Sequence, residues 1–322
     1  MRRQIQVRPA HTTADNDEIA RIICAVHPDW PRTGTQVAAA AARRGPRLHR
    51  KFVIDDAPGR LAAFGFVEVP DVAAVAGRFH VRVTVDPACT GRGFGKLLYQ
   101  RLEVEARDLH ATELCTEVLE AHPRAARFAT DRGFKVYNRR VESRLRLNEI
   151  DPARVARGLD AHTDRLFASG IRIASYRQLA LDPLAAPRRL YALQADLWRD
   201  VPFGITGDDS TFEAFLAEEL GDPAFRAAGT FVALDGPDWI GLCMQSSTDS
   251  HLLTTMTGVV QAWRRHGVAY WLKLHSVRYA LETGVAEIRT FNDVANEGML
   301  ALNRRLGFTP VSTEVRLKKE LR

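Results

Sequence analysis

The chain has 322 residues, of which 46% are hydrophobic and 26% charged, and its formal net charge is +6 at pH 7. This length allows about two domains, and no apolar run approaches the roughly 18 residues that a membrane-spanning helix needs. No two of the four cysteines lie close together in the sequence, and no histidine lies at ligand spacing from any of them. This pattern excludes a disulfide framework and a zinc site. The arginines are scattered, without the clustered aromatics of a nucleic-acid-binding face. We therefore expect a cytoplasmic protein that binds no metal, nucleic acid or membrane.

The N-terminal half is predicted to begin with a strand at residues 5–8 and to contain a second, stronger strand at Val81–Val85. This strand has β-branched residues at alternate positions. It is expected to end at Asp86-Pro87, because proline has no backbone N–H to donate to a neighbouring strand. The segment Lys96–Leu109 has the apolar spacing of a helix. Between strand and helix lies the glycine-rich loop TGRGFG, residues 90–95. Such a loop places free N–H groups at a helix N-terminus, where an anion is favoured.

The join between two halves is predicted between Leu147, where an alternating strand ends, and Gly170. Asp151-Pro152 is typical of a helix start, so residues 151–162 are expected to form a short connecting helix. The expected domains are residues 1–147 and 170–322, with 148–169 as the connecting segment. No low-complexity linker separates them, and we expect the halves to pack together.

The C-terminal half repeats this order of elements. A strand is predicted at residues 171–175 and another at Leu252–Val260. A turn at Gln261–His266 then leads into a helix that runs from Val268 to a C-terminal cap at Gly284. The loop before this helix reads RRHGVA, residues 264–269.

A constant spacing indicates that the two halves are copies of one unit. Each loop is followed by a Gly-Phe pair, and forty residues separate Gly93 from Gly133 and Gly267 from Gly307. Each copy therefore has a strand, a glycine-bearing loop, a helix, a strand, a helix and Gly-Phe. This order is typical of a unit that holds a phosphate-bearing ligand.

Three kinds of phosphate loop compete for this interpretation. A dinucleotide fingerprint G-x-G-x-x-G would need glycine at Lys96 or Leu98, and a Walker loop would need a hydroxyl residue at Leu97. The remaining pattern is Q/R-x-x-G-x-G/A, which Arg264, Gly267 and Ala269 satisfy. The chain thereby resembles the GCN5-related N-acetyltransferase (GNAT) family. The first copy matches the glycines of the pattern but has Thr90 at the basic position.

The resemblance extends beyond the loops and covers nearly the whole chain. In the family, the pattern N-x-x-A/M-x-x-x-Y/N-x-x-x-G-F follows, and here it is matched by Asn296, Met299, Asn303, Gly307 and Phe308. Two copies in one chain are similar to two-domain bacterial acetyltransferases of the mycothiol synthase type. The resemblance implies an α/β fold with two tandem GNAT domains. Each would be a mixed, mostly antiparallel sheet, splayed at a central parallel pair and flanked by helices.

The same resemblance implies acetyl-CoA as the cofactor. Strand ends beside the splay would meet the thioester carbonyl and stabilise the developing oxyanion, and the loops would hold the pyrophosphate. In the second copy the implied cofactor-binding residues are Thr257, Gly258, Val259, Val260, Arg264, Arg265, His266, Gly267, Val268, Ala269 and Asn296. In the first copy they are Val83, Val85, Thr90, Gly91, Arg92, Gly93, Phe94 and Gly95.

The catalytic acid and base are harder to assign. Many family members have a tyrosine four residues before the Gly-Phe pair, and this chain has Asn303 there, whose amide can only hydrogen-bond. Candidate bases in the second copy are Asp249 and His251, on the turn before the strand. Glu68 and His80 occupy analogous places in the first copy.

We therefore expect an N-acetyltransferase that moves an acetyl group from acetyl-CoA to a primary amine of a small molecule. The more complete motif set favours the C-terminal copy as the catalytic one. The alternative, suggested by the missing tyrosines, is a non-catalytic acyl-CoA-binding or regulatory tandem protein. The expected assembly is a monomer or homodimer.

Overall fold

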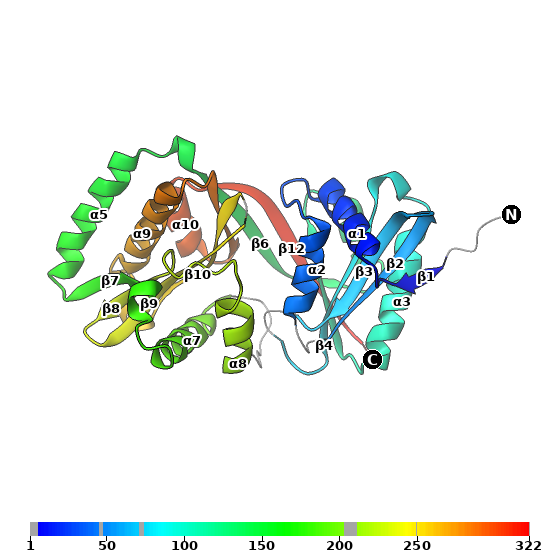
Figure 1. The fold of residues 1–322 in the computed structure, drawn as a ribbon, viewed down its shortest axis with the longest axis horizontal. Helices are drawn as coiled ribbons and strands as arrows, with labels where there is room; N and C mark the ends of the chain where they lie inside the picture. The colour runs from blue at the N-terminus through cyan, green and yellow to red at the C-terminus, as the bar shows by residue number, and fades with distance from the viewer. Residues whose placement is uncertain (1–5, 45–47, 71–73, 203–210, 249, 322) are drawn as a thin grey trace.

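The computed structural model describes residues 6–44, 48–70, 74–202, 211–248 and 250–321. Twelve strands in this part of the chain form one continuous sheet, in the order β1-β2-β3-β4-β5-β12-β6-β11-β10-β9-β8-β7. Figure 1 shows the two halves side by side, with the long strands β6 and β12 crossing between them. The sheet is thus shared by both copies.

The N-terminal half contains the first six strands and four helices. Thr12 and Thr33 begin α1 and α2 with capping boxes, in which side chain and backbone satisfy each other's polar groups. The bounds are β1 (Val7–Pro9), α1 (Thr13–Val26), α2 (Gly34–Arg43), β2 (His49–Ala57), β3 (Arg60–Glu68), β4 (Arg78–Val85), α3 (Phe94–Asp108), β5 (Glu113–Leu119), α4 (Pro123–Thr130) and β6 (Lys135–Arg146).

The C-terminal half begins with α5, whose N-cap Asp151 accepts a hydrogen bond from the Ala153 amide at 2.9 Å. The predicted connecting helix is therefore present, and it extends beyond the expected end at residue 162. The bounds are α5 (Pro152–Phe167), β7 (Ile171–Ser175), α6 (Tyr176–Leu179), α7 (Ala185–Trp198), α8 (Phe212–Phe215), β8 (Phe231–Asp235), β9 (Asp238–Ser247), β10 (His251–Val259), α9 (Val268–Thr283), β11 (Glu287–Asp293), α10 (Glu297–Leu306) and β12 (Thr309–Glu320).

The two halves exchange their last strands. β12, at the end of the second copy, pairs with β5 of the first copy over seven residues, Glu113 to Leu119. β6, at the end of the first copy, pairs with β11 of the second, and β6 and β12 also pair with each other. The domain boundaries at residues 147 and 170 therefore stay predictions. In space, each half of the sheet contains a strand from the other copy.

Helices cover both faces of the sheet in each half. In the first half, α1 and α2 pack on one face through Ile19, Ile22 and Val37, and α3 packs on the other through Leu98 and Leu102. In the second half, α7 and α9 lie on opposite faces, in separate clusters of buried residues. α5 packs against α9 through Val155 and Leu159.

The predicted fold class is confirmed. The strands are antiparallel except for two parallel pairs, β4 with β5 and β10 with β11, one in each copy. Both pairs are short, because the strands separate after a few residues. These two openings position the candidate sites.

Candidate functional site

In the first copy, the strands β4 and β5 open into a splay. Their pairing ends at His80 and Cys115, although β4 continues to Val85. Beyond His80, β4 pairs with β3 alone, with Val83 opposite Gly65 and Val85 opposite Ala63. Its second edge, facing the splay, is left without a strand in the described part of the chain. The implied strand end Val83–Val85 therefore does border an opening.

The second copy contains an equivalent splay between β10 and β11. Pairing ends at Thr254 and Thr290, and β10 continues to Val259 beside β9 alone. The implied residues Thr257, Gly258 and Val259 border this opening, while the Val260 amide bonds the Ile240 carbonyl. One difference is a register shift between Thr254 and Met256, which β4 lacks. A bulge of this kind re-aims side chains locally.

The two glycine-bearing loops have nearly the same backbone conformation. Gly93 caps α3 with φ 87° and ψ −4°, and Gly267 caps α9 with φ 86° and ψ −1°. Thr90 and Arg264 are also matched, at φ −64° and −69° with ψ 151° and 153°. These angles support the alignment of the two copies that the sequence predicted.

The residue that follows Thr90 and the residue that follows Arg264 both adopt the left-handed backbone conformation, but they differ in type. Gly91 has φ 82°, whereas Arg265 holds φ 65° at a cost that glycine avoids. Both loops lead directly into a helix whose first N–H groups have no partner in the helix, so both suit a phosphate.

The space over both loops is open at the positions that a Cβ atom on their glycines would occupy. At Gly93 nothing lies within 4 Å, and at Gly91 only the Arg124 guanidinium approaches, at 3.7 Å. At Gly267 the nearest atom belongs to His162 of α5, at 4.0 Å. Both cradles are open, and the N–H donors of 91–95 and 265–269 fit the pyrophosphate of acetyl-CoA.

Two arginines place positive charge beside the first loop, the predicted Arg92 and also Arg124. Arg92 pairs with Asp56 at 2.7 Å and lies over the Phe94 ring, 4.7 Å from its centroid. Arg124, in the first turn of α4, brings its guanidinium to 3.7 Å from the position that a Cβ atom on Gly91 would occupy. The sequence pattern contained no signal for Arg124, because it lies outside the loop and approaches through the fold.

The second loop keeps its basic residue, but other groups engage it. Arg264 donates to the Val259 carbonyl at 3.0 Å and pairs with the carboxylate of Asp200. His162 of α5 stacks on Tyr270, with ring centroids 5.0 Å apart, beside the start of α9. The His266 ring nitrogen lies 2.8 Å from the Arg264 carbonyl. The charge of Arg264 is thus shared with an acidic partner.

Two asparagines of the second copy serve the fold. Asn296 caps α10, because its side-chain oxygen accepts from the Met299 amide at 3.1 Å. Asn303 is 1% exposed and donates to Asn292 at 2.7 Å, while its own Oδ1 has no partner.

The Nζ of the buried Lys273 in α9 is likewise without a hydrogen-bond partner.

Titratable groups gather at the opening of the first copy. The His80 ring lies between two carboxylates, with Nδ1 3.3 Å from Glu68 and Nε2 2.8 Å from Glu117. Glu117 of β5 also pairs with Arg82 of β4. Because His80 is the last paired residue of β4, these contacts bridge the two strands where they begin to separate.

Glu68 is held as an anion. Its burial alone would raise its pKa, but hydrogen bonds from His49 and His80 and the charge of Arg44 bring the pKa down to about 2. The contact to His49 is 2.5 Å and that to Arg44 is 3.0 Å. A carboxylate with so low a pKa is a poor base, but it fixes the orientation of the imidazole beside it.

His251 occupies a different kind of position in the second copy. It lies three residues before the end of the β10–β11 pairing, about 10 Å from the opening along the strand. Its side chain is buried beside Thr248, 2.9 Å from Nδ1, and Nε2 has no partner. Burial and then the charge of Arg289 lower its pKa to about 4. The other candidate base, Asp249, lies outside the described residues.

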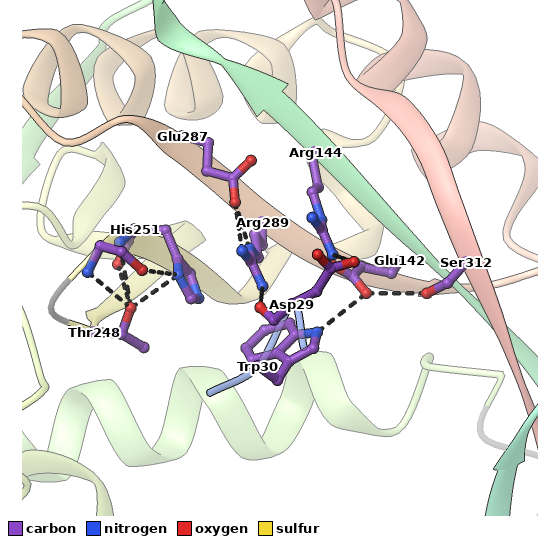
Figure 2. A network of polar contacts seen from close by, with 10 residues as sticks. Asp29, Trp30, Glu142, Arg144, Thr248, His251, Glu287, Arg289 and Ser312 are labelled. Atoms are coloured by element: carbon purple, nitrogen blue, oxygen red, sulfur yellow. Dashed lines mark hydrogen bonds and ion pairs between the residues drawn. The ribbon is translucent and has the colours of Figure 1, made fainter. Parts of the chain in front are cut away.

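A loop of the first copy covers this part of the second (Figure 2). Trp30, between α1 and α2, meets His251 edge-on at 5.0 Å and carries Arg289 over its ring at 4.5 Å. Its indole donates to Glu142 at 3.3 Å, and Arg289 donates to the Asp29 carbonyl at 2.6 Å. Sequence reasoning did not find this contact, since no local pattern links residue 30 to strands β6 and β11.

No group of three or more metal-ligating side chains occurs among the residues that the structure describes. Within the same residues, no helix has the length and apolar character needed to cross a membrane.

Comparison with known proteins supports the resemblance. Residues 16–134 match the model of the acetyltransferase (GNAT) family. No curated protein matches the chain in sequence.

Several solved structures share the fold. A GCN5-related N-acetyltransferase from Sphaerobacter thermophilus is 20% identical, with a TM-score of 0.72 over 99% of this chain and 96% of its own. A tandem GNAT protein from the clavulanic acid biosynthesis pathway is 19% identical, with a TM-score of 0.71 and 98% of each chain covered. A glucosamine N-acetyltransferase region in a fungal GH3 β-N-acetylglucosaminidase is 16% identical, with a TM-score of 0.72 over 98% of this chain and 38% of that one.

These likenesses span both halves, and the match to the family model lies in the first. The chain is a tandem GNAT-fold protein that carries the acetyltransferase family signature in its N-terminal copy.

Proposed function

We propose that the protein is an N-acetyltransferase that moves the acetyl group of acetyl-CoA to a primary amine of a small molecule, and that the N-terminal copy performs the transfer. The observation that carries this assignment is the contact between His80 and Glu117 across the opening of β4 and β5. The R-x-x-G-x-A motif had favoured the C-terminal copy. In that copy, His251 is distant from the opening and lies beneath Trp30.

Several groups of the N-terminal copy support binding of acetyl-CoA, which supplies the activated acetyl thioester. The amides of residues 91–95 and the guanidinium of Arg124 are available to its phosphates. The free edge of β4 at Val83–Val85 offers backbone N–H groups to a thioester carbonyl, where they would stabilise negative charge in the transition state.

His80 and Glu117 are the proposed route for the proton of the amine. The acceptor must lose a proton before its nitrogen can form the amide bond as the carbon–sulfur bond breaks, and the departing thiolate gains a proton. Glu68 fixes the imidazole at Nδ1, which leaves Nε2 and the Glu117 carboxylate to hold the transferred proton.

Direct attack by the amine is favoured over a covalent cysteine intermediate. Cys115 is the thiol at the end of the strand pairing, and burial raises its pKa to about 12. A thiol with this pKa is almost entirely protonated near neutral pH and is a weak nucleophile. The C-terminal copy would then bind acetyl-CoA without turning it over, or stabilise its partner through the shared sheet.

The test is a comparison of His80→Gln with His251→Gln, using release of free CoA thiol from acetyl-CoA with a panel of primary amines. Loss of the base should lower kcat by a factor of about 100 or more in His80→Gln and remove the rise of activity with pH. His251→Gln should retain both. A normal pH–rate profile in His80→Gln, or its loss in His251→Gln, would assign the chemistry to the other copy. A protein that binds acetyl-CoA but acetylates no amine would favour the acyl-CoA-binding alternative.

A further inference from the structure

Charged side chains cross the middle of the sheet on one face. This face is the one on which α1 and α2 pack, because Arg82 lies opposite Phe66, a residue that packs against the α1–α2 cluster. On the neighbouring strands, Glu117 is paired with Arg316, and Glu314 is paired with Arg140. We call these five charged residues, Arg82, Glu117, Arg140, Glu314 and Arg316, the central charged face.

The strand exchange brings this face together. Arg140 belongs to β6 and Arg316 to β12, the two strands that cross between the halves (Figure 1). Arg140 pairs with Glu314 at 2.7 Å, and their side chains are 30% and 19% exposed, so solvent still reaches them. The face begins beside the β4–β5 opening, since Arg82 and Glu117 bond to each other there.

Arg32 adds a further positive charge. It lies on the loop between α1 and α2, two residues after Trp30. The Trp30 ring lies 5.6 Å from that of Phe291, and Arg140 of the face lies 4.4 Å from the same Phe291 ring. In the described part of the chain no carboxylate lies within salt-bridge distance of the Arg32 guanidinium, and the Cys24 thiol donates to the Arg32 carbonyl. The face together with Arg32 therefore holds four arginines against two glutamates.

The surroundings of these arginines disfavour their charge. Burial lowers the pKa of Arg82, and burial followed by the charge of Arg140 lowers the pKa of Arg316 to about 10. Arg32 itself is exposed to solvent, so an incoming ligand can reach its guanidinium. Arginines gathered on a solvent-accessible face repel one another, and an anionic ligand would offset that repulsion.

The loop that carries Arg32 is fixed at a nearby point. Trp30 donates to Glu142 of the exchanged strand β6, and the Asp29 carbonyl accepts from Arg289 of β11 (Figure 2). The capping box of α2 begins at Thr33. Arg32 therefore lies between two anchored residues, and its backbone is positioned before any ligand arrives.

We propose that the amine acceptor carries a carboxylate, and that Arg32 binds it over the central charged face. This inference rests on the proposed function, because the face adjoins the opening where His80 and Glu117 lie. The CoA phosphates would bind elsewhere, at the start of α3, which packs on the opposite face of the sheet. Arg32 would act on specificity, with its largest effect on KM.

The first test measures acetylation of matched amine pairs that differ only in a carboxylate, such as phenylalanine and phenethylamine. The carboxylated member should have a KM at least about 10-fold lower, as for a charge-assisted hydrogen bond. Arg32→Gln should remove this preference with little change in kcat, while Arg157→Gln, an exposed arginine of α5, should retain it. Equal kcat/KM within the pairs, or an equal loss for both members in Arg32→Gln, would overturn the proposal.

The second test does not depend on turnover. Succinate, compared with uncharged succinamide, should raise the thermal unfolding midpoint of the CoA-saturated protein, and Arg32→Gln should abolish the shift while Arg157→Gln keeps it. A shift that survives in Arg32→Gln, or no shift in the unmodified protein, would reject the anion site. If the shift behaves as expected and no amine is acetylated, the anion site stands and the proposed function fails.

Discussion

The indole of Trp30 donates a hydrogen bond to the buried carboxylate of Glu142, 3.3 Å away, on β6, the strand of the N-terminal copy that pairs with β11 of the C-terminal copy. Glu142 also accepts from Arg144 at 2.6 Å and Ser312 at 3.0 Å, so both of its oxygens are satisfied (Figure 2). A loop of the N-terminal copy is thereby fixed to strands that belong to the C-terminal half of the sheet.

Trp30→Phe should lower the free energy of unfolding by about 1–2 kcal/mol, because Glu142 loses one donor while most ring packing remains. Trp30→Ala should cost more, about 3 kcal/mol, because the contacts with His251, Phe291 and Arg289 are also lost. Urea denaturation would measure both values. Equal stability of the two variants would show that the ring contacts contribute nothing.

The strand exchange predicts that a core substitution near the C-terminus destabilises the N-terminal half. Leu317 of β12 is fully buried in the cluster that contains Phe79, Leu114 and Phe134. Leu317→Ala should cost about 2–5 kcal/mol and raise hydrogen exchange in β5. Leu242→Ala, in the core of the second half, should instead raise exchange in β8 and β10. Faster exchange confined to the second half in Leu317→Ala would contradict the topology.

Much of the fold was predictable because it is encoded locally. Strands and helices could be predicted from alternating apolar residues, from the Asp151-Pro152 helix start and from the Gly284 helix cap. The tandem order could be predicted from the repeated spacing of the Gly-Phe pairs. The exchange of β6 and β12 was not predictable, since a strand's pattern fixes which face it buries but not its neighbour. The candidate site was likewise predictable only in its local features. The loops were found from their glycines, whereas the roles of Glu117, Arg124 and Trp30 depend on contacts between distant segments.

His251 predicts a pH-dependent contribution to stability. Its pKa is about 4 in the folded protein and 6.5 in the unfolded chain, so the unfolded state binds more protons between these values. The free energy of unfolding should therefore rise with pH across that window. His251→Gln should flatten this rise by roughly 2–3 kcal/mol, compared with the exposed control His11→Gln. Denaturation curves at several pH values would show this, and parallel profiles for all three proteins would refute the burial of a neutral imidazole.

Asn303 should have no role in proton transfer, because its amide does not titrate. Asn303→Ala should leave the pH at which activity is half-maximal unchanged from about pH 6 to 9. Measurement of kcat/KM across this range checks the point. A lost alkaline limb in the variant would indicate that Asn303 supports the acid after all.

The central claim is that acetyl transfer occurs at the opening of the N-terminal copy, and the two loop glycines test it most directly. Valine at Gly93 or Gly267 would place a β-branched side chain at a left-handed position over the phosphate cradle. Gly59→Val and Gly284→Val impose similar backbone strain at sites away from the loops and serve as controls. Gly93→Val should abolish release of CoA thiol in a folded protein, while Gly267→Val and both controls should retain it. Loss of turnover in Gly267→Val with full activity in Gly93→Val would contradict this claim and assign catalysis to the C-terminal copy.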